Sequence, residues 1–208
     1  MSASLATVHV VDDDPSFLTA VARLLRAGGY QVKTFASAAG FLQIPPADSP
    51  GCVIADLQMP GLGGLELQDA LTAAGNPLPI VFLTGHGDIP TSVRAMRQGA
   101  EDFLTKPVKK QDLFDAVQRA LSRAAKEREE QAHRRELRAR FDTLTPRERE
   151  VLGHVLSGQL NKQIAGDLGT SERTIKAHRA NIMAKLQVQS VAELARLAQE
   201  AGVSVIGD

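Results

Sequence analysis

The chain has 208 residues, enough for one or two domains of ordinary size, and its 43% apolar and 23% charged content is typical of a soluble globular protein. No apolar run approaches the ~18 residues of a membrane helix, and the first residues lack the pattern of a signal peptide. The one cysteine, Cys52, cannot form an internal disulfide. These features favour a cytoplasmic protein that does not engage a membrane.

The net charge is zero, but it is unevenly distributed along the chain. Residues 1–122 carry 9 Lys and Arg against 12 Asp and Glu, and residues 123–208 carry 15 against 12. An acidic first part and a basic second part suggest two domains with different tasks.

The first predicted elements are a strand over residues 8–11 and a helix over residues 15–27, joined by three adjacent aspartates. We expect Asp14 to cap the helix, with Pro15 at its first position. Phe17 begins the apolar stripe of that helix. Local structure leaves Asp12 and Asp13 unexplained, and like charges at a strand end are favourable if a cation binds there.

The same alternation of strand and helix continues to residue 122. Further strands are predicted over residues 31–35, 53–55, 80–83 and 102–105, and helices over 37–43, 64–74, 89–98 and from 111 onward. Five strands alternating with five helices predict an α/β fold, a doubly wound five-stranded parallel sheet with right-handed crossovers. The flavodoxin-like strand order 2-1-3-4-5 would place the first and third strands beside the ligand-binding edge.

Polar side chains gather at the predicted carboxyl ends of these strands. Asp12 and Asp13 follow the first strand, Asp56 the third, Thr84 the fourth and Lys106 the fifth. Oxygen ligands of this kind suit Mg²⁺ better than zinc. The alternative for Asp56 is that it only caps the turn that follows it.

Four motifs in this order resemble the receiver domain of two-component response regulators, over about residues 5–122. They are Val11-Asp12-Asp13, Asp56-Leu57-Gln58-Met59-Pro60-Gly61, Leu83-Thr84-Gly85 and Thr105-Lys106-Pro107. The segment from Thr84 to Pro90 resembles the FixJ-type branch in particular.

This resemblance implies a role for each strand-end residue. Asp56 would accept a phosphoryl group from a sensor histidine kinase. Asp13, Asp56 and the Gln58 carbonyl would bind Mg²⁺, with Asp12 holding a metal-bound water. The switch residues would be Thr84, Phe103 and Lys106, although Phe103 could instead be a plain core residue. Gln58 and His86 would influence how fast the phosphoryl group is hydrolysed.

Residues 123–141 are rich in Ala, Glu, Arg and Lys and have few large apolar side chains. The pairs Glu130 with Arg134 and Glu136 with Arg140 favour a helix. We predict a solvated helical linker that extends the last receiver helix. A coiled-coil rod is the alternative, but its apolar seam is weak.

Residues 142–208 predict an all-α domain of four helices. Thr145, Ser171 and Ser190 are the expected N-caps of its first, third and fourth helices, and Asn161 begins the second. Thr145 and Glu148 are expected to form a capping box. Two short helices joined by a tight turn at Gly169 form a helix-turn-helix pattern.

The outer face of the third helix is basic, which suits the major groove of DNA, although such a face is often only solvated surface. Its members are Arg173, Thr174, Lys176, Ala177, Arg179, Ala180 and Lys185. Three motifs in this region resemble the LuxR-type DNA-binding domain. They are residues 144–152, Asn161-Lys162-Gln163-Ile164-Ala165 and Thr174-Ile175-Lys176-Ala177-His178-Arg179.

The LuxR-type resemblance implies that Lys176, Ala177 and Ala180 face base edges. Phosphates would be held by Thr174, Arg179, Lys185, Asn161 and Lys162. Many relatives have a long or charged side chain at the position of Ala180, so their base preferences do not transfer directly.

Together the two resemblances imply a transcriptional response regulator that dimerises on phosphorylation and binds double-stranded promoter DNA, with RNA polymerase as a candidate partner. It would not be an enzyme, beyond its own phosphorylation from a donor and slow loss of the phosphoryl group. An aspartate-dependent phosphatase is one alternative, but Leu57-Gln58 replaces the expected Asp-x-Asp pattern. A LuxR-type DNA-binding regulator that works without phosphorylation is another.

Overall fold

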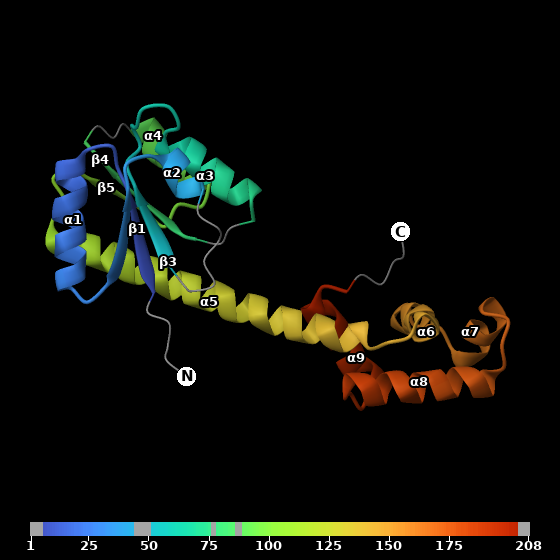
Figure 1. Cartoon of the computed structure of the whole chain (residues 1–208). Helices are drawn as coiled ribbons and strands as arrows, with labels where there is room; N and C mark the ends of the chain where they lie inside the picture. Colours follow the sequence, from blue (N-terminus) through green and yellow to red (C-terminus); the bar gives the residue numbers. More distant parts are fainter. Residues whose placement is uncertain (1–5, 44–50, 76–77, 86–88, 204–208) are drawn as a thin grey trace. The chain divides into compact units, whose positions relative to one another are not determined.

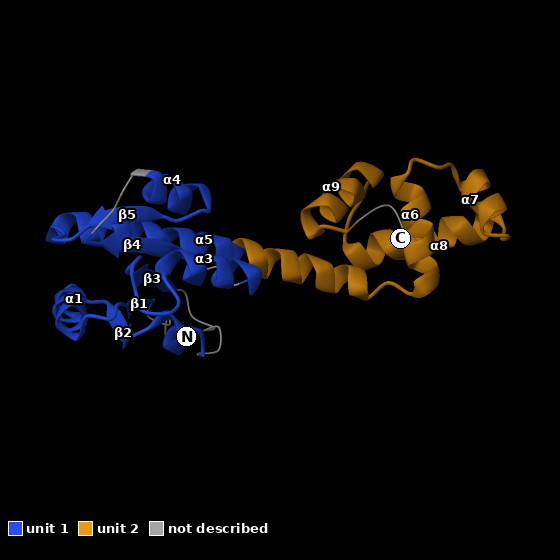
Figure 2. Ribbon diagram, turned by 90° about the horizontal axis from the view of Figure 1, so that it is seen from above, with its two compact units in different colours: residues 1–129 blue, residues 130–208 orange. Residues whose placement is uncertain are grey.

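The computed structural model describes residues 6–43, 51–75, 78–85 and 89–203. The chain divides into two compact units, residues 1–129 and residues 130–208 (Figure 2). Within the described residues, no helix is both long enough and apolar enough to cross a membrane.

The first unit is built on a five-stranded parallel sheet of order β2-β1-β3-β4-β5 (Figure 1). Its strands are β1 (Thr7–Val11), β2 (Gln31–Phe35), β3 (Gly51–Ala55), β4 (Ile80–Thr84) and β5 (Asp102–Thr105). The three inner strands, β1, β3 and β4, are buried along their whole length, as expected for a parallel sheet covered on both faces. The predicted fold class and strand order are confirmed.

Helices cover both faces of this sheet. They are α1 (Pro15–Ala27), α2 (Ala38–Leu42), α3 (Gly64–Ala73), α4 (Ile89–Arg97) and α5 (Lys110–Asp142). On one face, Leu25 of α1 and Val117 of α5 pack with Ile54 of β3. On the other face, Phe41 of α2 and Leu67 of α3 pack against Phe82 of β4.

The first helix begins where its sequence predicts. Asp14 has extended backbone geometry, and its Oδ1 accepts hydrogen bonds from the backbone N–H of Ser16 at 2.8 Å and of Phe17 at 3.2 Å. Pro15 occupies the first helical position, where no N–H is needed. Asp14 therefore serves the helix, which leaves Asp12 and Asp13 for the edge of the sheet.

The second unit adds four helices to the end of α5. They are α6 (Pro146–Leu156), α7 (Asn161–Asp167), α8 (Glu172–Leu186) and α9 (Val191–Ala201). A reciprocal capping box of Thr145 and Glu148 starts α6, and the Ser171 and Ser190 side chains cap α8 and α9. The core includes Val151 of α6, Ile164 of α7, Ile182 of α8 and Leu194 of α9. The short α7 and the longer α8 have the predicted helix-turn-helix order.

The helix α5 continues without interruption through the segment predicted as a linker. Leu137 and Phe141, one turn apart near its end, are buried in the core of the second unit. The predicted helix is therefore present, but its last part is packed rather than solvated. These two side chains are the large apolar residues of an otherwise polar segment, and they lie on the face of α5 that is buried in the second unit.

Candidate functional site

Three carboxylates meet at the carboxyl ends of β1 and β3. Val11 and Ala55 are paired across the two strands, so the residues that follow them lie side by side. Asp12, Asp13 and Asp56 each offer a carboxylate oxygen, and the three atoms lie within 4.8 Å of one another. Asp12 is buried, Asp56 half-buried and Asp13 exposed, so the cluster opens toward solvent.

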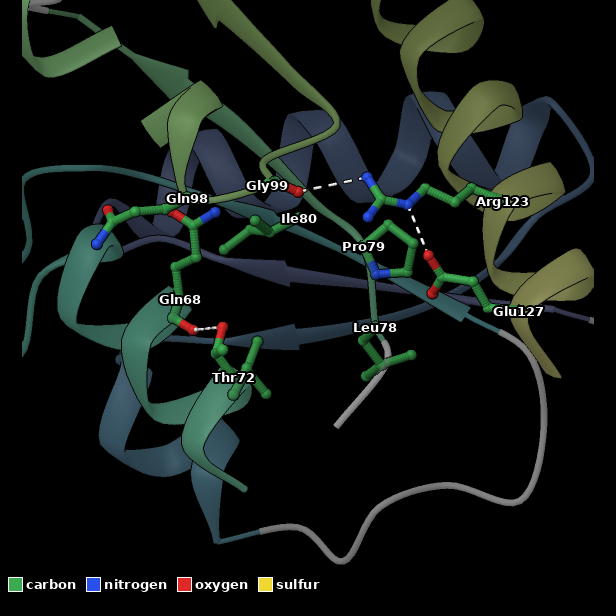
Figure 3. Close-up of a pocket in the computed structure, with 10 residues that line it drawn as sticks. Gln68, Thr72, Leu78, Pro79, Ile80, Gln98, Gly99, Arg123 and Glu127 are labelled. Atoms are coloured by element: carbon green, nitrogen blue, oxygen red, sulfur yellow. Dashed lines mark hydrogen bonds and ion pairs between the residues drawn. The ribbon is translucent and has the colours of Figure 1, made fainter. Parts of the chain in front are cut away.

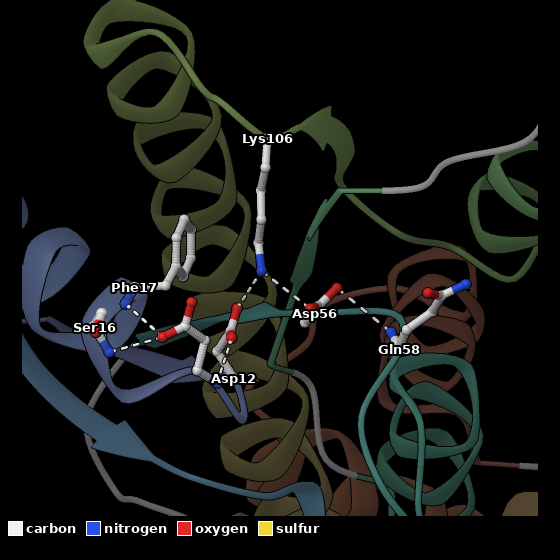
Figure 4. Close-up of polar contacts among 7 residues, drawn as sticks. Asp12, Ser16, Phe17, Asp56, Gln58 and Lys106 are labelled. Atoms are coloured by element: carbon white, nitrogen blue, oxygen red, sulfur yellow. Dashed lines mark hydrogen bonds and ion pairs between the residues drawn. The ribbon is translucent and has the colours of Figure 1, made fainter.

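Lys106, which follows β5, reaches into this cluster (Figure 4). Its Nζ donates to Asp12 Oδ2 at 2.6 Å and to Asp56 Oδ2 at 3.0 Å. The same ammonium lies 4.0 Å from the centre of the Phe17 ring. The ammonium of a residue that follows β5 thus bridges two carboxylates that follow β1 and β3.

The ionisation of these groups reflects their crowding. Burial raises the pKa of the Asp12 carboxyl, against the lowering effect of the Lys106 hydrogen bond. Burial alone would lower the pKa of Lys106, but its hydrogen bonds to Asp12 and Asp56 outweigh burial and raise it. A site with an excess of negative charge over the one ammonium has room for a further cation.

The donor set fits a hard divalent cation. All three clustered side chains offer oxygen, and the described residues add no thiolate or imidazole to the group. This chemistry suits Mg²⁺, which prefers carboxylate oxygens and retains water. Gln58, exposed two residues after Asp56, donates its backbone N–H to Asp56 Oδ1 at 3.4 Å.

Gly64 allows α3 to begin directly beside Asp56. A Cβ at this position would lie 2.5 Å from the Asp56 carbonyl oxygen and 2.9 Å from the Phe82 ring. Any larger residue would push the turn after β3 away from the sheet. Close packing therefore requires glycine at position 64.

The remaining predicted switch residues lie on the neighbouring strands. Thr84 is the last residue of β4 and is 1% exposed, and its carbonyl accepts the Lys106 N–H at 2.7 Å. Phe103 of β5 is half-buried, with its ring centre 6.4 Å from that of Phe82. His86 lies outside the described residues.

A separate cavity of about 240 Å³ lies near the start of β4 (Figure 3). Arg123 of α5 crosses it, with its Nε donating to Glu127 at 2.8 Å and its Nη1 to the Gly99 carbonyl at 3.4 Å. Among the described residues that line the cavity, the charged ones are Arg123 and Glu127, and these two side chains are paired with each other.

The predicted DNA-facing residues of the second unit lie largely on its surface. Those of α8 that are exposed are Arg173, Thr174, Lys176, Ala177, Ala180 and Lys185, whereas Arg179 is half-buried. On α7, Lys162 is exposed and Asn161 is half-buried. Lys176 forms an ion pair with Glu172 at 3.3 Å, one turn earlier on the same helix.

Lys185 has internal partners that its sequence position does not reveal. Its Nζ donates to the buried carboxylate of Glu148 at 2.6 Å and to the Thr143 carbonyl at 3.2 Å. The Lys185 hydrogen bond, followed by that of the Thr145 N–H, lowers the pKa of Glu148. This ammonium therefore joins α8 to the start of α6.

Two contacts of these residues were not predicted from the sequence, that of Phe17 with Lys106 and that of Glu148 with Lys185. Phe17 was expected only in the apolar stripe of α1, and Glu148 only in a capping box. In both contacts the two residues are far apart in the chain, so no local sequence pattern predicts them. The one signal for Phe17 is an aromatic side chain in the first turn after the acidic cluster.

Comparison with known proteins matches both units. Residues 8–118 match the family model of the response regulator receiver domain, and residues 142–198 match that of bacterial regulatory proteins of the luxR family. Nodulation protein W of Bradyrhizobium diazoefficiens is 43% identical over 199 residues, 96% of this chain and 88% of that protein. The transcriptional regulatory protein FixJ of Azorhizobium caulinodans is 42% identical over 201 residues, 97% of this chain and 95% of that protein.

A solved structure is similar over nearly the whole chain. The response regulator StyR shares 46% sequence identity, with 95% of this chain and 100% of that one covered and a TM-score of 0.78. The likeness in sequence and in structure thus extends over both units.

Proposed function

This chain belongs to the response regulators in which a receiver domain precedes a LuxR-type DNA-binding domain, and from that premise we propose that phosphorylation of Asp56 controls its binding to promoter DNA. The resemblances expected from the sequence, including that to FixJ, are confirmed. The observation that carries the proposal is the contact of Lys106 with Asp12 and Asp56 at 2.6 and 3.0 Å.

The reaction at Asp56 is an in-line transfer of a phosphoryl group. A carboxylate oxygen bonds to phosphorus while the bond from phosphorus to the imidazole nitrogen of a histidine kinase breaks. The imidazole keeps the electron pair and takes up a proton. Asp56 suits this role because it is half-buried at the open edge of the cluster, whereas Asp12 is buried behind it.

The other residues of the site neutralise and orient charge. Asp12, Asp13, Asp56 and the Gln58 carbonyl would hold Mg²⁺, with Asp12 acting through water. When bound, that ion neutralises the negative charge that otherwise keeps a carboxylate and a phosphoryl group apart. Lys106, already at the Asp56 oxygen, pairs with the phosphoryl oxygens after transfer.

The signal then leaves the site through Thr84 and Phe103. The Thr84 hydroxyl hydrogen-bonds a phosphoryl oxygen, and Phe103 moves inward as Thr84 moves. The face formed by α4, β5 and α5 then becomes the contact of a homodimer. Val93 and Met96 of α4 support this assignment because they are exposed apolar side chains, at 43% and 45%.

DNA binding follows from the second unit. Lys176, Ala177 and Ala180 would read base edges, and Arg173 would lie on the same DNA-facing surface. Phosphates would be held by Thr174, Arg179, Lys185, Asn161 and Lys162. A dimer brings two copies of α8 to two half-sites, which raises their effective concentration. The protein acts in the cytoplasm, with a sensor histidine kinase and promoter DNA as partners and RNA polymerase as a candidate third. It turns over no external substrate.

The test of the phosphate site is labelling by a small phosphodonor. Acetyl phosphate with Mg²⁺ should add one acid-labile phosphoryl group to the protein, detected as a gain of one phosphate by intact mass spectrometry. Asp56→Asn should abolish the labelling. Asp69→Asn, the same change on the exposed surface of α3, is the matched control and should be labelled normally. Equal labelling of the Asp56 variant would place the site elsewhere.

A further inference from the structure

Phe17 presents the face of its ring to the ammonium group of Lys106. The residue lies in the first turn of α1, and its backbone N–H is bound by the Asp14 cap at 3.2 Å. The half-buried ring packs against the core between α1 and α5. Lys106 Nζ lies 4.0 Å from the ring centre, and the same ammonium donates to the Asp12 and Asp56 carboxylates (Figure 4).

The three partners of the Lys106 ammonium differ in whether they can bind a metal ion or a phosphoryl group. Asp12 and Asp56 carry the oxygens that a divalent cation and a phosphoryl group would engage. A divalent cation on these oxygens neutralises part of their charge and weakens the two ion pairs, and a phosphoryl group on Asp56 replaces the carboxylate's ion pair with one to the phosphoryl oxygens. The ring is not a ligand for a cation of that kind, so its attraction for the ammonium persists.

We propose that Phe17 is a positioning residue, which holds Lys106 at the phosphoacceptor through the face of its ring. This rests on the proposed function of Asp56 and Lys106. The lysine side chain is flexible and its ammonium is strongly hydrated. A fixed partner restricts its conformations to those from which the ammonium reaches the phosphoryl oxygens. A leucine at position 17 would fill the apolar stripe of α1 without providing this contact.

The contact itself is measured in the metal-free protein by NMR. Protons on the Lys106 Cε should be shifted upfield by the ring current of Phe17. Phe17→Leu should remove the shift, and Phe17→Tyr should retain it. Phe114→Leu is the matched control, since that ring lies 5.4 Å from Lys110 on the same unit and is remote from Asp56; it should leave the Lys106 protons unchanged.

The consequence is measured as the rate of phosphorylation by acetyl phosphate. Phe17→Leu should slow the reaction about twofold to fivefold, the range expected for one contact between a cation and a ring, and Phe17→Tyr should restore the rate. In a Lys106→Met background, Phe17→Leu should have no further effect, because the ring then has no cation to hold. Thermal unfolding of each variant separates this effect from a loss of folding.

The outcomes separate this proposal from the one on which it rests. A wild-type rate for Phe17→Leu, an equal loss in the Lys106→Met background, or an unshifted Lys106 proton in the wild type would each overturn the positioning role. Undiminished labelling of Asp56→Asn would instead overturn the phosphoacceptor, while the NMR shift would still report the contact.

Discussion

At the scale of single residues, His9 shows how burial changes chemistry within the sheet. His9 lies on β1 with 3% exposure, and the centre of its ring is 5.9 Å from that of Phe35 and 5.4 Å from that of Phe41. Its Nδ1 has no hydrogen-bond partner within the described residues. Burial, with a smaller contribution from the charge of Lys33, lowers the pKa of His9 to about 4.

A titration of His9 tests this environment. Because the folded pKa lies below the ordinary value of 6.5, the unfolded chain binds the proton more tightly. The contribution of neutral His9 to the free energy of unfolding is fully present above pH 6.5 and is lost as the pH falls toward 4. Imidazole carbon shifts in NMR should report a midpoint near 4, and His133, which is exposed, serves as the reference signal. A His9 midpoint near 6.5 would show that the ring is solvated.

Lys185 is the residue for which sequence and structure suggest different partners. The LuxR-type resemblance assigns it to a phosphate, and that assignment stays a prediction. The structure engages its ammonium with Glu148, whose side chain is 4% exposed. An ammonium bound to a buried carboxylate has less capacity to neutralise a phosphate. We therefore expect replacement of Lys185 to affect mainly the stability of the second unit.

Replacement of Lys185 by alanine distinguishes the two roles. Loss of Lys185 leaves the buried Glu148 carboxylate without a cation, although the Thr145 N–H still donates to it, so the free energy of unfolding should fall by about 1–3 kcal/mol. Urea denaturation followed through the second unit measures this, and Lys162→Ala, at an exposed position, should change it little. Unchanged stability together with a salt slope of DNA binding lower by about one would support the phosphate contact instead.

At the scale of elements, the sequence predicts strands and helices where the signals are local. The helix over residues 15–27 has its cap, its proline and its closing Gly28 in sequence, and the structure has the same bounds. The convergence of Asp12, Asp56 and Lys106 was also predictable, because strand order places carboxyl ends at one edge. The roles of those residues remain proposals.

The features that the sequence does not predict depend on contacts between distant parts of the chain. No local sequence pattern predicts that Leu137 and Phe141 pack against the helices that follow them. A polar helix with two apolar residues could equally be exposed to water. The partner of Lys185 lies 37 residues away and that of Lys106 lies 94 residues away. Such pairs follow from the fold, which must be known before they can be identified.

The helix α8 is expected to recognise bases, and we predict that Lys176 contacts one of them. Lys176→Ala should weaken binding to the preferred site by about 1–3 kcal/mol and relax preference at one base position. Binding to a panel of sites that vary in one base pair measures both effects. Glu172→Gln is the control, because it removes the ion pair and leaves the lysine. If Lys176→Ala weakens all sites alike, the lysine contacts a phosphate.

At the scale of the whole molecule, the question is how the receiver controls the second unit. Dimerisation through α4, β5 and α5 is the scheme that we favour. Arg94, Arg97 and Asp112 are its candidate ion pairs, although Arg94 also lies 3.9 Å from Asp69 within its own chain. Inhibition, in which the unphosphorylated receiver covers α8, is the competing scheme.

A fragment without the receiver separates the two schemes. It should begin at residue 130, where the second compact unit starts, because a start after residue 137 would remove Leu137 from the core of that unit. Dimer activation predicts that residues 130–208 bind DNA as weakly as the unphosphorylated whole protein, and that fusion to a constitutive dimer restores binding. Fluorescence anisotropy on one promoter fragment compares them. Binding by the fragment as tight as that of the phosphorylated protein would favour inhibition.

The central claim is that phosphorylation of Asp56 controls DNA binding, and one titration tests it most directly. Promoter DNA recovered with the phosphorylated protein is titrated with wild type and Asp56→Asn, each with and without acetyl phosphate and Mg²⁺. We expect the phosphodonor to tighten binding of the wild type by about tenfold or more, as a linked pair of half-sites allows, and to leave Asp56→Asn unchanged. Equal and tight binding in all four conditions would contradict the claim and identify a regulator that works without phosphorylation.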